Sequence, residues 1–334
     1  FMRVLFADRS FERLFDVLRP IFQGHDVRAA NVKEDDDALS WAEVLVVGPP
    51  IPVDDSILDR APGLKLVHQW GVGTEAIDVE ACTRRALPVC NVPSRGTGNA
   101  EGVAEIALLH MLLLAKRYYR CCENIKKRRA FAPRGMTLWG KKACVIGLGG
   151  VGLAVAERLS GLGMSVVGVN RTLRPELEEF GFESLHHLAQ LRDAVKGCHF
   201  VIIALTLTPE TEGIIDEDVL SSMERYSFLI NVARASLVRR SALEKALDEG
   251  WIAGAGLDVF WDEPISPDDP FLNRQNVTIT PHVGGTNDAA QEKIPAFIAE
   301  NVNRLERGEP LESCLNCGKL IQGGDQERSS AETG

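Results

Sequence analysis

The chain has 334 residues, more than a single hydrophobic core usually supports, so two domains are expected. Its formal net charge of −10 argues against a nucleic-acid-binding surface, and the basic run from Lys126 to Arg129 is interpreted as a solvated helix end. No apolar run has the length of a membrane span, and the N-terminus lacks the pattern of a secretory signal. We therefore expect a cytoplasmic protein with no membrane partner.

The eight cysteines do not indicate a disulfide framework in so long a chain. Cys144 and Cys198 lie in or beside apolar, strand-like segments, which fits a reducing compartment. Cys314 and Cys317 have a spacing common in metal sites, but no second pair follows and no histidine lies in the tail. We therefore expect no metal site.

The first part of the chain alternates short apolar runs with helical segments, a pattern typical of a parallel α/β sheet. The runs between Arg3 and Asn91 are RVLFA, EVLVVG, LKLVH and LPVCN. Ser10 is expected to cap the first helix. From about Asn99, apolar residues recur at helical spacing, which predicts a long helix that connects two domains.

The second part repeats the alternation with more strongly buried strands. The runs are ACVIG, SVVGV, FVIIAL, SFLINVA, AGAGLDV and VTITP. They predict a doubly wound parallel sheet with helices on both faces. A final helix is expected to return to the first domain, so that residues 2–98 and 287–322 form one domain and 99–286 the other. Residues 323–334 are polar and predicted to be a mobile tail.

A glycine-rich turn follows the first of these runs and indicates dinucleotide binding. Gly147 permits the tight turn, Gly149 lets a pyrophosphate approach the backbone, and Gly152 lets helix and strand pack closely. The helix that begins here offers its N–H groups to the phosphates, so Gly150 and Val151 are also expected to contact the cofactor.

The acid that usually binds the adenosine ribose is missing. At the end of the next strand stand Asn170, Arg171 and Thr172. An Asp would accept hydrogen bonds from a ribose 2′-hydroxyl and repel a 2′-phosphate, whereas these residues, with Arg174, offer donors and positive charge. NADP(H) is therefore predicted to be preferred over NAD(H). The alternative is that both arginines are exposed loop residues and that NAD binds through the glycine turn alone.

Three polar residues follow predicted strands at the edge where open α/β sheets bind ligands: Arg234, Glu263 and His282. Each also has a structural interpretation, as an exposed loop arginine, a surface acid beside a proline, and a core histidine of the kind expected for His110. Trp70 could border a pocket or fill the core of its domain, and the sequence leaves both open.

The chain resembles the D-isomer-specific 2-hydroxyacid dehydrogenase family over nearly its whole length. The matching blocks are GVGTEAIDV, NAEGVAE, GLGGVG, LTLTPET, NVARASLV, LDVFWDEP and TPHVGG. The resemblance implies a Rossmann cofactor domain inserted into a smaller flavodoxin-like substrate domain, and usually a homodimer joined through the cofactor domains.

The resemblance also implies roles for single residues. Arg234 would bind the carboxylate and carbonyl of the substrate, His282 would be the acid/base, and Glu263 would support the histidine. Ala235 stands where the family mostly has Gly, a departure expected to shift the loop. Further contacts are expected from the backbone amides of Val72 and Gly73 to the substrate carboxylate. Residues expected at the cofactor are Thr206 on the adenosine side, Asp258 near the nicotinamide carboxamide, Val232 and Gly284.

These residue types suit the reduction of a 2-keto acid. As hydride reaches C2, negative charge develops on the C2 oxygen, which needs a proton donor. Histidine titrates near working pH, and an adjacent carboxylate stabilises its protonated form. An arginine fork binds a planar carboxylate with two charge-assisted hydrogen bonds, a geometry that lysine does not offer.

The leading hypothesis is therefore a reductase of small 2-keto acids such as glyoxylate or hydroxypyruvate. Formate dehydrogenases are disfavoured because they carry Gln where Glu263 stands. Phosphoglycerate dehydrogenases stay open, although the residues after Arg307 are too few for an additional regulatory domain. A dinucleotide-sensing scaffold resembling the C-terminal-binding co-repressors is the alternative from another class, but neither a basic nuclear cluster nor a long disordered tail favours it.

Overall fold

The computed structural model describes residues 1–48 and 51–320, so the predicted tail at 323–334 lies outside the described residues. The chain divides into two compact units, Phe1–Thr97 with Asp288–Gly334, and Gly98–Asn287. No helix among the described residues is both long and apolar enough to cross a membrane.

The first unit is built on a five-stranded parallel sheet with the strand order β2-β1-β3-β4-β5. This is the flavodoxin-like order, as predicted. The strands are β1 (Arg3–Phe6), β2 (Asp26–Ala29), β3 (Val44–Val47), β4 (Leu66–Gln69) and β5 (Val89–Cys90).

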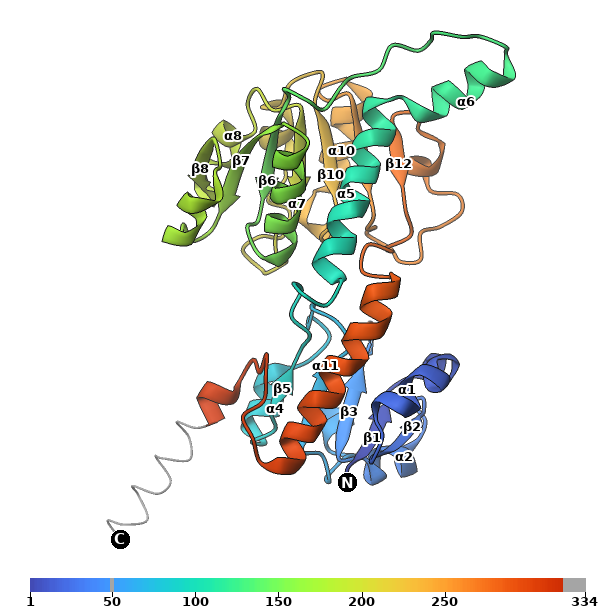
Figure 1. The fold of residues 1–334 in the computed structure, drawn as a ribbon, viewed down its shortest axis with the longest axis vertical. Coiled ribbons are helices and arrows are strands. Elements are labelled where there is room, and N and C mark those ends of the chain that lie inside the picture. The colour runs from blue at the N-terminus through green and yellow to red at the C-terminus, as the bar shows by residue number, and fades with distance from the viewer. Residues whose placement is uncertain (49–50, 321–334) are drawn as a thin grey trace. The chain divides into compact units, whose positions relative to one another are not determined.

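Helices cover both faces of this sheet (Figure 1). They are η1 (Arg9–Leu14), α1 (Phe15–Ile21) and α11 (Asp288–Arg307) on one face, and α2 (Asp36–Trp41), α3 (Asp55–Leu58) and α4 (Val79–Arg84) on the other. Side chains alternate along each strand, so Phe6 packs with Ile298 of α11, while Leu5 packs with Leu39 of α2. The long C-terminal helix thus completes the core of the N-terminal sheet.

Two local features of the first unit settle questions that the sequence raised. Asp8, not Ser10, caps the first helix, because the Asp8 carboxylate lies two residues earlier and accepts a hydrogen bond from the Ser10 N–H at 2.7 Å. The prediction for Ser10 was wrong. Trp70 is partly buried and packs against the core, with its ring 5.1 Å from Phe11 and 6.0 Å from Phe6 between ring centroids.

The second unit contains a seven-stranded parallel sheet with the order β12-β11-β10-β9-β6-β7-β8. Counted within the unit, this is the Rossmann order with one further strand, which confirms the predicted doubly wound fold. The strands are β6 (Lys142–Ile146), β7 (Ser165–Asn170), β8 (Ser184–His187), β9 (Phe200–Ile203), β10 (Phe228–Asn231), β11 (Gly254–Leu257) and β12 (Val277–Ile279). The edge strand β8 was not predicted, because its sequence SLHH contains no apolar run.

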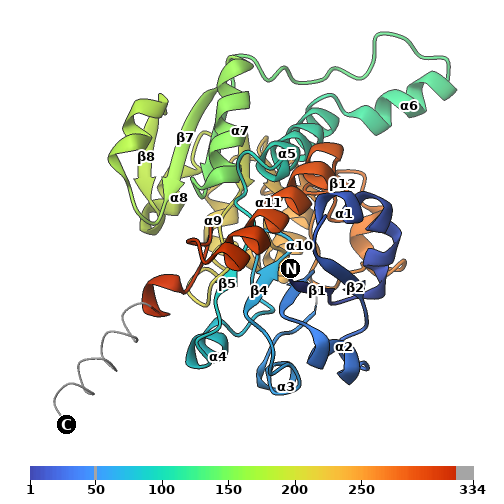
Figure 2. The same cartoon turned by 60° about the horizontal axis from the view of Figure 1, so that its bottom comes forward.

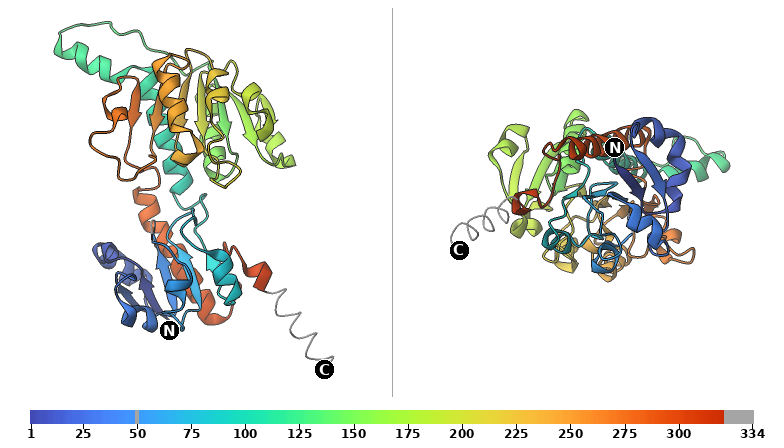
Figure 3. Two further views of the ribbon diagram at one scale, coloured as in Figure 1. Left: turned by 180° about the vertical axis from the view of Figure 1, so that it is seen from behind. Right: turned by 90° about the horizontal axis from the view of Figure 1, so that it is seen from below.

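Helices cover both faces of the second sheet as well. On one face are α5 (Asn99–Ala115) and α7 (Gly150–Gly161), and on the other are α8 (Leu191–Ala194), α9 (Glu217–Ser221) and α10 (Arg240–Asp248) (Figures 1 and 3). The predicted long helix from Asn99 is α5. The remaining helices are α6 (Tyr118–Lys126), η2 (Pro175–Phe180), η3 (Leu188–Gln190), η4 (Ala235–Leu237) and η5 (Pro270–Asn273).

The cysteine pair near the C-terminal end of the described chain is oxidised. Cys314 and Cys317 form a disulfide, with Cα atoms 5.6 Å apart, a separation that suits such a bond. The cysteines were expected to be reduced, and this disulfide is the exception among the described residues. The six others are free thiols. No group of potential metal ligands is found among the described residues.

A buried histidine joins the C-terminal helix to the first sheet. His68 of β4 donates from Nδ1 to the Gln69 carbonyl at 2.9 Å, and its Nε2 accepts from the Asn301 amide of α11 at 3.0 Å. Burial lowers the pKa of His68 from 6.5 to about 4, because an imidazolium is poorly solvated there. The folded protein therefore holds a neutral ring.

This predicts that the first unit loses stability in acid. The folded-state pKa lies below the unfolded value, so the contribution of His68 is complete above about pH 6.5 and is lost as pH falls towards 4, by at most about 3 kcal/mol. Thermal unfolding of wild type and His68→Gln between pH 4 and 7.5 measures this pH-dependent contribution of His68 to stability. Wild type should lose more stability across this range than the variant, and equal losses would contradict the assignment.

Candidate active site

The glycine turn between β6 and α7 is shaped for a phosphate-bearing ligand. Gly147 has a φ of +92°, and a Cβ there would lie 2.6 Å from the Ala204 carbonyl oxygen. A Cβ on Gly152 would overlap the carbonyl oxygen of Gly147. At Gly149, in contrast, a Cβ would meet nothing within 4 Å. The turn is thus closely packed on the protein side and open where α7 presents the unpaired N–H groups of its first turn, so it fits a dinucleotide pyrophosphate.

Asn170 ends β7 and holds the glycine turn in place. Its Oδ1 accepts from the Leu148 N–H at 3.1 Å, and its Nδ2 donates to the Thr172 carbonyl at 2.8 Å. Sequence reasoning considered only the charge at this position. The structure adds a function for the amide itself, because it connects the glycine turn to the loop that carries Arg171.

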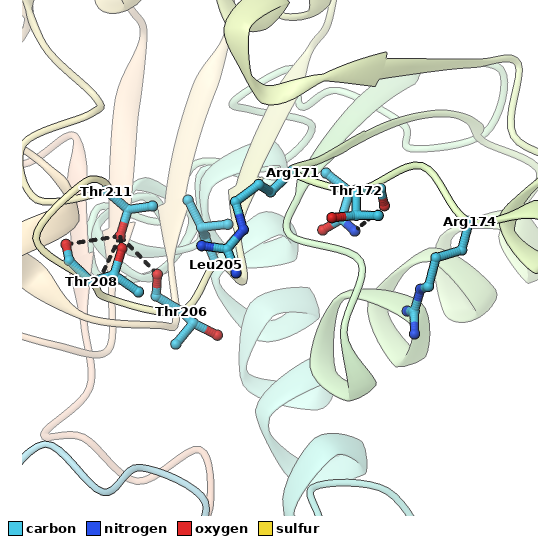
Figure 4. A pocket seen from close by; sticks show the side chains of 8 residues that line it. Arg171, Thr172, Arg174, Leu205, Thr206, Thr208 and Thr211 are labelled. Carbon is cyan, nitrogen blue, oxygen red and sulfur yellow. Dashed lines mark hydrogen bonds between the residues drawn. The ribbon is translucent and has the colours of Figure 1, made fainter. Parts of the chain in front are cut away.

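An open cavity of about 400 Å³ lies beside this loop. It is lined by Asn170, Arg171, Thr172, Arg174, Leu205, Thr206, Thr208 and Thr211. Figure 4 shows Arg171 between the threonines of the 206–211 loop and the side chains of Thr172 and Arg174. The Thr211 hydroxyl donates to the Thr206 carbonyl at 2.9 Å and accepts from the Thr208 N–H at 2.7 Å. Thr208 and Thr211 had not been predicted here, although the repeated threonines of LTLTPET were a usable signal.

The structure brings His282 and Glu263 together. His282 Nδ1 lies 2.7 Å from Glu263 Oε2, and the other carboxylate oxygen accepts from the Phe260 N–H at 3.0 Å. Both side chains are partly exposed, 44% for the histidine and 37% for the glutamate. Because Glu263 occupies Nδ1, Nε2 is the ring nitrogen that remains to exchange a proton with a ligand.

Arg234 follows β10 and is held by the last residue of that strand. Asn231 accepts from the Ala233 N–H at 3.1 Å and donates to the Arg234 carbonyl at 3.0 Å. Ala235 is buried and has no positive φ, so the loop accommodates its Cβ without a left-handed backbone. The Val232 side chain packs in the core beside α5, which leaves only its backbone to meet a cofactor.

Asp258 follows β11 and is 1% exposed. Its Oδ1 accepts from the Thr280 hydroxyl at 2.6 Å and the Val283 N–H at 3.0 Å, and its Oδ2 accepts from the Gly284 N–H at 2.9 Å. A Cβ on Gly284 would lie only 3.0 Å from Oδ2, so glycine permits this close approach. The carboxylate predicted to meet the nicotinamide thus holds the loop that contains His282.

Val72 and Gly73 belong to the first unit, in the loop after β4. The Val72 carbonyl accepts from the Asn91 side chain at 2.7 Å, and the Gly71 carbonyl accepts from the Val92 N–H at 3.0 Å. Within residues 1–48 and 51–320, no acceptor is found for the N–H groups of Val72 and Gly73. The carbonyls fix the loop, and the two amides remain able to bind an anion.

The fold and these residues define a dinucleotide-dependent α/β enzyme, and comparison with known proteins gives its family. The sequence model described as D-isomer specific 2-hydroxyacid dehydrogenase, NAD binding domain, matches residues 108–284. The glyoxylate reductase of Thermococcus kodakarensis is 35% identical over 271 residues, which cover 79% of this chain and 80% of that protein.

Solved structures agree with this match. An NADPH-dependent glyoxylate/hydroxypyruvate reductase from Sinorhizobium meliloti, in complex with NADP and malonate, has a TM-score of 0.79 at 26% identity and covers 94% of this chain and 96% of that one. A D-lactate dehydrogenase from Aquifex aeolicus, complexed with NAD and lactic acid, has a TM-score of 0.80 at 25% identity, with coverages of 96% and 98%.

The chain belongs to the D-isomer-specific 2-hydroxyacid dehydrogenase family. It is an NAD(P)-dependent oxidoreductase that acts on 2-hydroxy acids or the corresponding 2-keto acids.

Proposed function

We propose that this protein reduces small 2-keto acids, such as glyoxylate or hydroxypyruvate, to D-2-hydroxy acids and uses NADPH in preference to NADH. The pair of His282 and Glu263, 2.7 Å apart after β12 and β11, carries the proposal. The names of the Thermococcus and Sinorhizobium relatives support the substrate class. In this proposal, residues 99–286 bind the dinucleotide, and residues 2–98 with 287–322 bind the substrate.

A nicotinamide dinucleotide held by the glycine turn of residues 147–152 would supply the hydride that C2 of the keto acid receives. The charge that develops on the C2 oxygen is neutralised by the proton on His282 Nε2. Glu263 accepts from Nδ1–H and thereby fixes the ring orientation, so that Nε2 is the nitrogen directed to the substrate. The Phe260 N–H in turn orients the Glu263 carboxylate.

In the second unit, Arg234 is the residue proposed to bind the substrate carboxylate. Arg234 offers a planar fork that matches a carboxylate and extends to its neighbouring carbonyl. In the first unit, the amides of Val72 and Gly73, which have no acceptor in the described part of the chain, are proposed as anion-binding donors. Each of these groups suits a small, planar, anionic substrate.

Replacing the proposed acid tests the reaction. His282→Ala should lower kcat by about 10²- to 10⁴-fold, the usual contribution of a positioned acid/base, and leave the cofactor Kd nearly unchanged. Steady-state reduction of glyoxylate and fluorescence titration with NADPH measure the two quantities. His187→Ala, which removes an exposed histidine of the edge strand β8, is the control and should behave as wild type. Near-wild-type turnover of His282→Ala would remove His282 from the mechanism.

The preference for NADPH rests on the cavity beside Asn170. Arg171 lies close enough to the 206–211 loop to contribute to the lowered pKa of Glu210, after the larger contribution of a hydrogen bond from the Thr208 side chain. Figure 4 shows the Arg171 side chain pointing towards the 206–211 loop, where Thr206 and Thr208 add hydroxyl groups. Such a set of donors suits a 2′-phosphate, and no carboxylate occupies the position that would repel one.

Removing this cation should weaken selection for the phosphate. Arg171→Ala should lower kcat/KM for NADPH by about tenfold and change kcat/KM for NADH by less than about twofold, because only the phosphorylated cofactor loses a charge-assisted hydrogen bond. The exposed Arg225→Ala is the matched control. A wild-type kcat/KM that is higher for NADH than for NADPH would refute the preference, and equal losses for both cofactors would refute the role of Arg171.

The second unit also presents an apolar surface suited to a second copy of this chain. Helix α6 and the segment after it extend away from the sheet (Figure 2). Their exposed side chains include Tyr118, Tyr119, Ile125, Phe131 and Trp139. A segment with several exposed large apolar side chains favours a protein interface, so we propose a homodimer formed through this unit.

Charge placed on this surface should separate the copies. Ile125 is 74% and Phe131 108% exposed, so the variant Ile125→Asp/Phe131→Asp should fold and sediment as a monomer of 36.6 kDa, while wild type sediments as a dimer. Leu162→Asp, on an exposed leucine outside this segment, should remain dimeric. A monomeric wild type would exclude the proposed assembly.

A further inference from the structure

His110 of α5 is a buried histidine that the proposed reaction does not use. It has no exposed surface, and its ring packs against β11 where a Cβ on Gly256 would lie 2.5 Å from the His110 Cβ. Burial lowers the pKa of His110 to about 4, although the charge of Asp258 acts in the opposite direction. The ring is therefore neutral and has one N–H donor and one acceptor nitrogen.

The hydrogen bonds of His110 determine which nitrogen carries the proton. Nε2 lies 2.9 Å from the Thr280 hydroxyl and Nδ1 lies 2.8 Å from the Thr278 hydroxyl. The single hydroxyl hydrogen of Thr280 is donated to Asp258 Oδ1 at 2.6 Å. Thr280 must therefore accept from His110, so Nε2 carries the proton and Nδ1 accepts from Thr278.

Through Thr280 this chain of hydrogen bonds reaches the loop of His282. Asp258 accepts from Thr280 and from the N–H groups of Val283 and Gly284. His282 lies between these residues, with a φ of +54° and its N–H bonded to the Thr280 carbonyl at 3.0 Å. A left-handed backbone is unfavourable for a residue with a Cβ, so it needs external restraint. The hydrogen bonds on both sides of His282 provide that restraint.

We propose that His110 is a positioning residue for the reaction: its Nε2–H directs the Thr280 hydroxyl onto Asp258, and Asp258 holds the turn that sets the orientation of His282. The inference rests on the proposed function of His282 as the acid. Without the His110 donor, the Thr280 hydroxyl can rotate away from Asp258, and the carboxylate loses its one side-chain donor among the described residues. The remaining two backbone hydrogen bonds then hold the turn alone.

A matched pair of substitutions separates positioning from packing. Glutamine and methionine have similar length and shape, but only glutamine retains an N–H donor. His110→Met should lower kcat by about tenfold, the effect of one lost hydrogen bond in a network, and His110→Gln should recover most of it. KM for glyoxylate and NADPH should change by less than about twofold in both variants, because neither ligand contacts His110 in the proposed site.

Substitutions at Thr280 and Thr278 give a second, independent test. Thr280→Val should lower kcat as His110→Met does, and Thr280→Ser, which keeps the hydroxyl, should restore it. Thr278→Val removes the hydrogen bond to the other nitrogen of the same ring. Thr278 is buried, but it lies outside the hydrogen-bond chain to Asp258. The substitution should lower the melting temperature and leave kcat within about twofold of wild type. The comparison of the Thr280 and Thr278 variants tests the positioning role even if the His110 variants do not fold.

The double variant and His282→Ala complete the test. If His110 acts through Thr280, His110→Met/Thr280→Val should have the same kcat as Thr280→Val alone. Additive losses, or wild-type kcat in both single variants while His282→Ala is inactive, would overturn the inference and leave the proposed function intact. Turnover retained by His282→Ala would instead refute the proposed acid and the inference with it.

Discussion

The buried carboxylate of Asp258 is the constraint on which the geometry of the second unit's site depends. A carboxylate that is 1% exposed must receive hydrogen bonds, because its desolvation would otherwise cost several kcal/mol. In this chain the donors are the Thr280 hydroxyl and two backbone amides of the following loop. The requirement to satisfy one charge at the end of β11 therefore fixes the loop after β12, and with it the left-handed backbone of His282.

Polar side chains at two other strand ends also fix loops by hydrogen bonds to the backbone. Asn170 at the end of β7 holds the glycine turn, and Asn231 at the end of β10 holds the loop of Arg234. Parallel strands bring their carboxyl ends to one edge of a sheet, where loops must be ordered before they can bind ligands. Short side chains with an amide or carboxylate suit this purpose, since they reach backbone groups of their own loop or of the loop after a neighbouring strand. Rigid loops in turn place Arg234 and His282 on a scaffold that cannot easily relax.

Much of this could be predicted because it depends on local pattern. The buried strands, the glycine turn and the long helix from Asn99 have strong periodicity or an obligatory residue type. The strand β8 and the disulfide of Cys314 and Cys317 were missed, since an edge strand needs no apolar run and a disulfide needs two Cα atoms at a distance that sequence does not encode. His110 was expected to be a core histidine, and it is buried. Its connection to Asp258 required knowledge of which strand α5 crosses, a tertiary contact without a sequence signal.

The central claim is that this site reduces small 2-keto acids. The most direct measurement follows oxidation of NADPH by the purified protein with 2-keto acids of graded size, from glyoxylate and hydroxypyruvate to branched and aromatic acids, with chiral analysis of the product. The highest kcat/KM is expected for the smallest acids, and a D-2-hydroxy acid is expected wherever the product is chiral. Absence of turnover with every acid, despite binding of the dinucleotide, would contradict this claim and favour a dinucleotide-sensing scaffold.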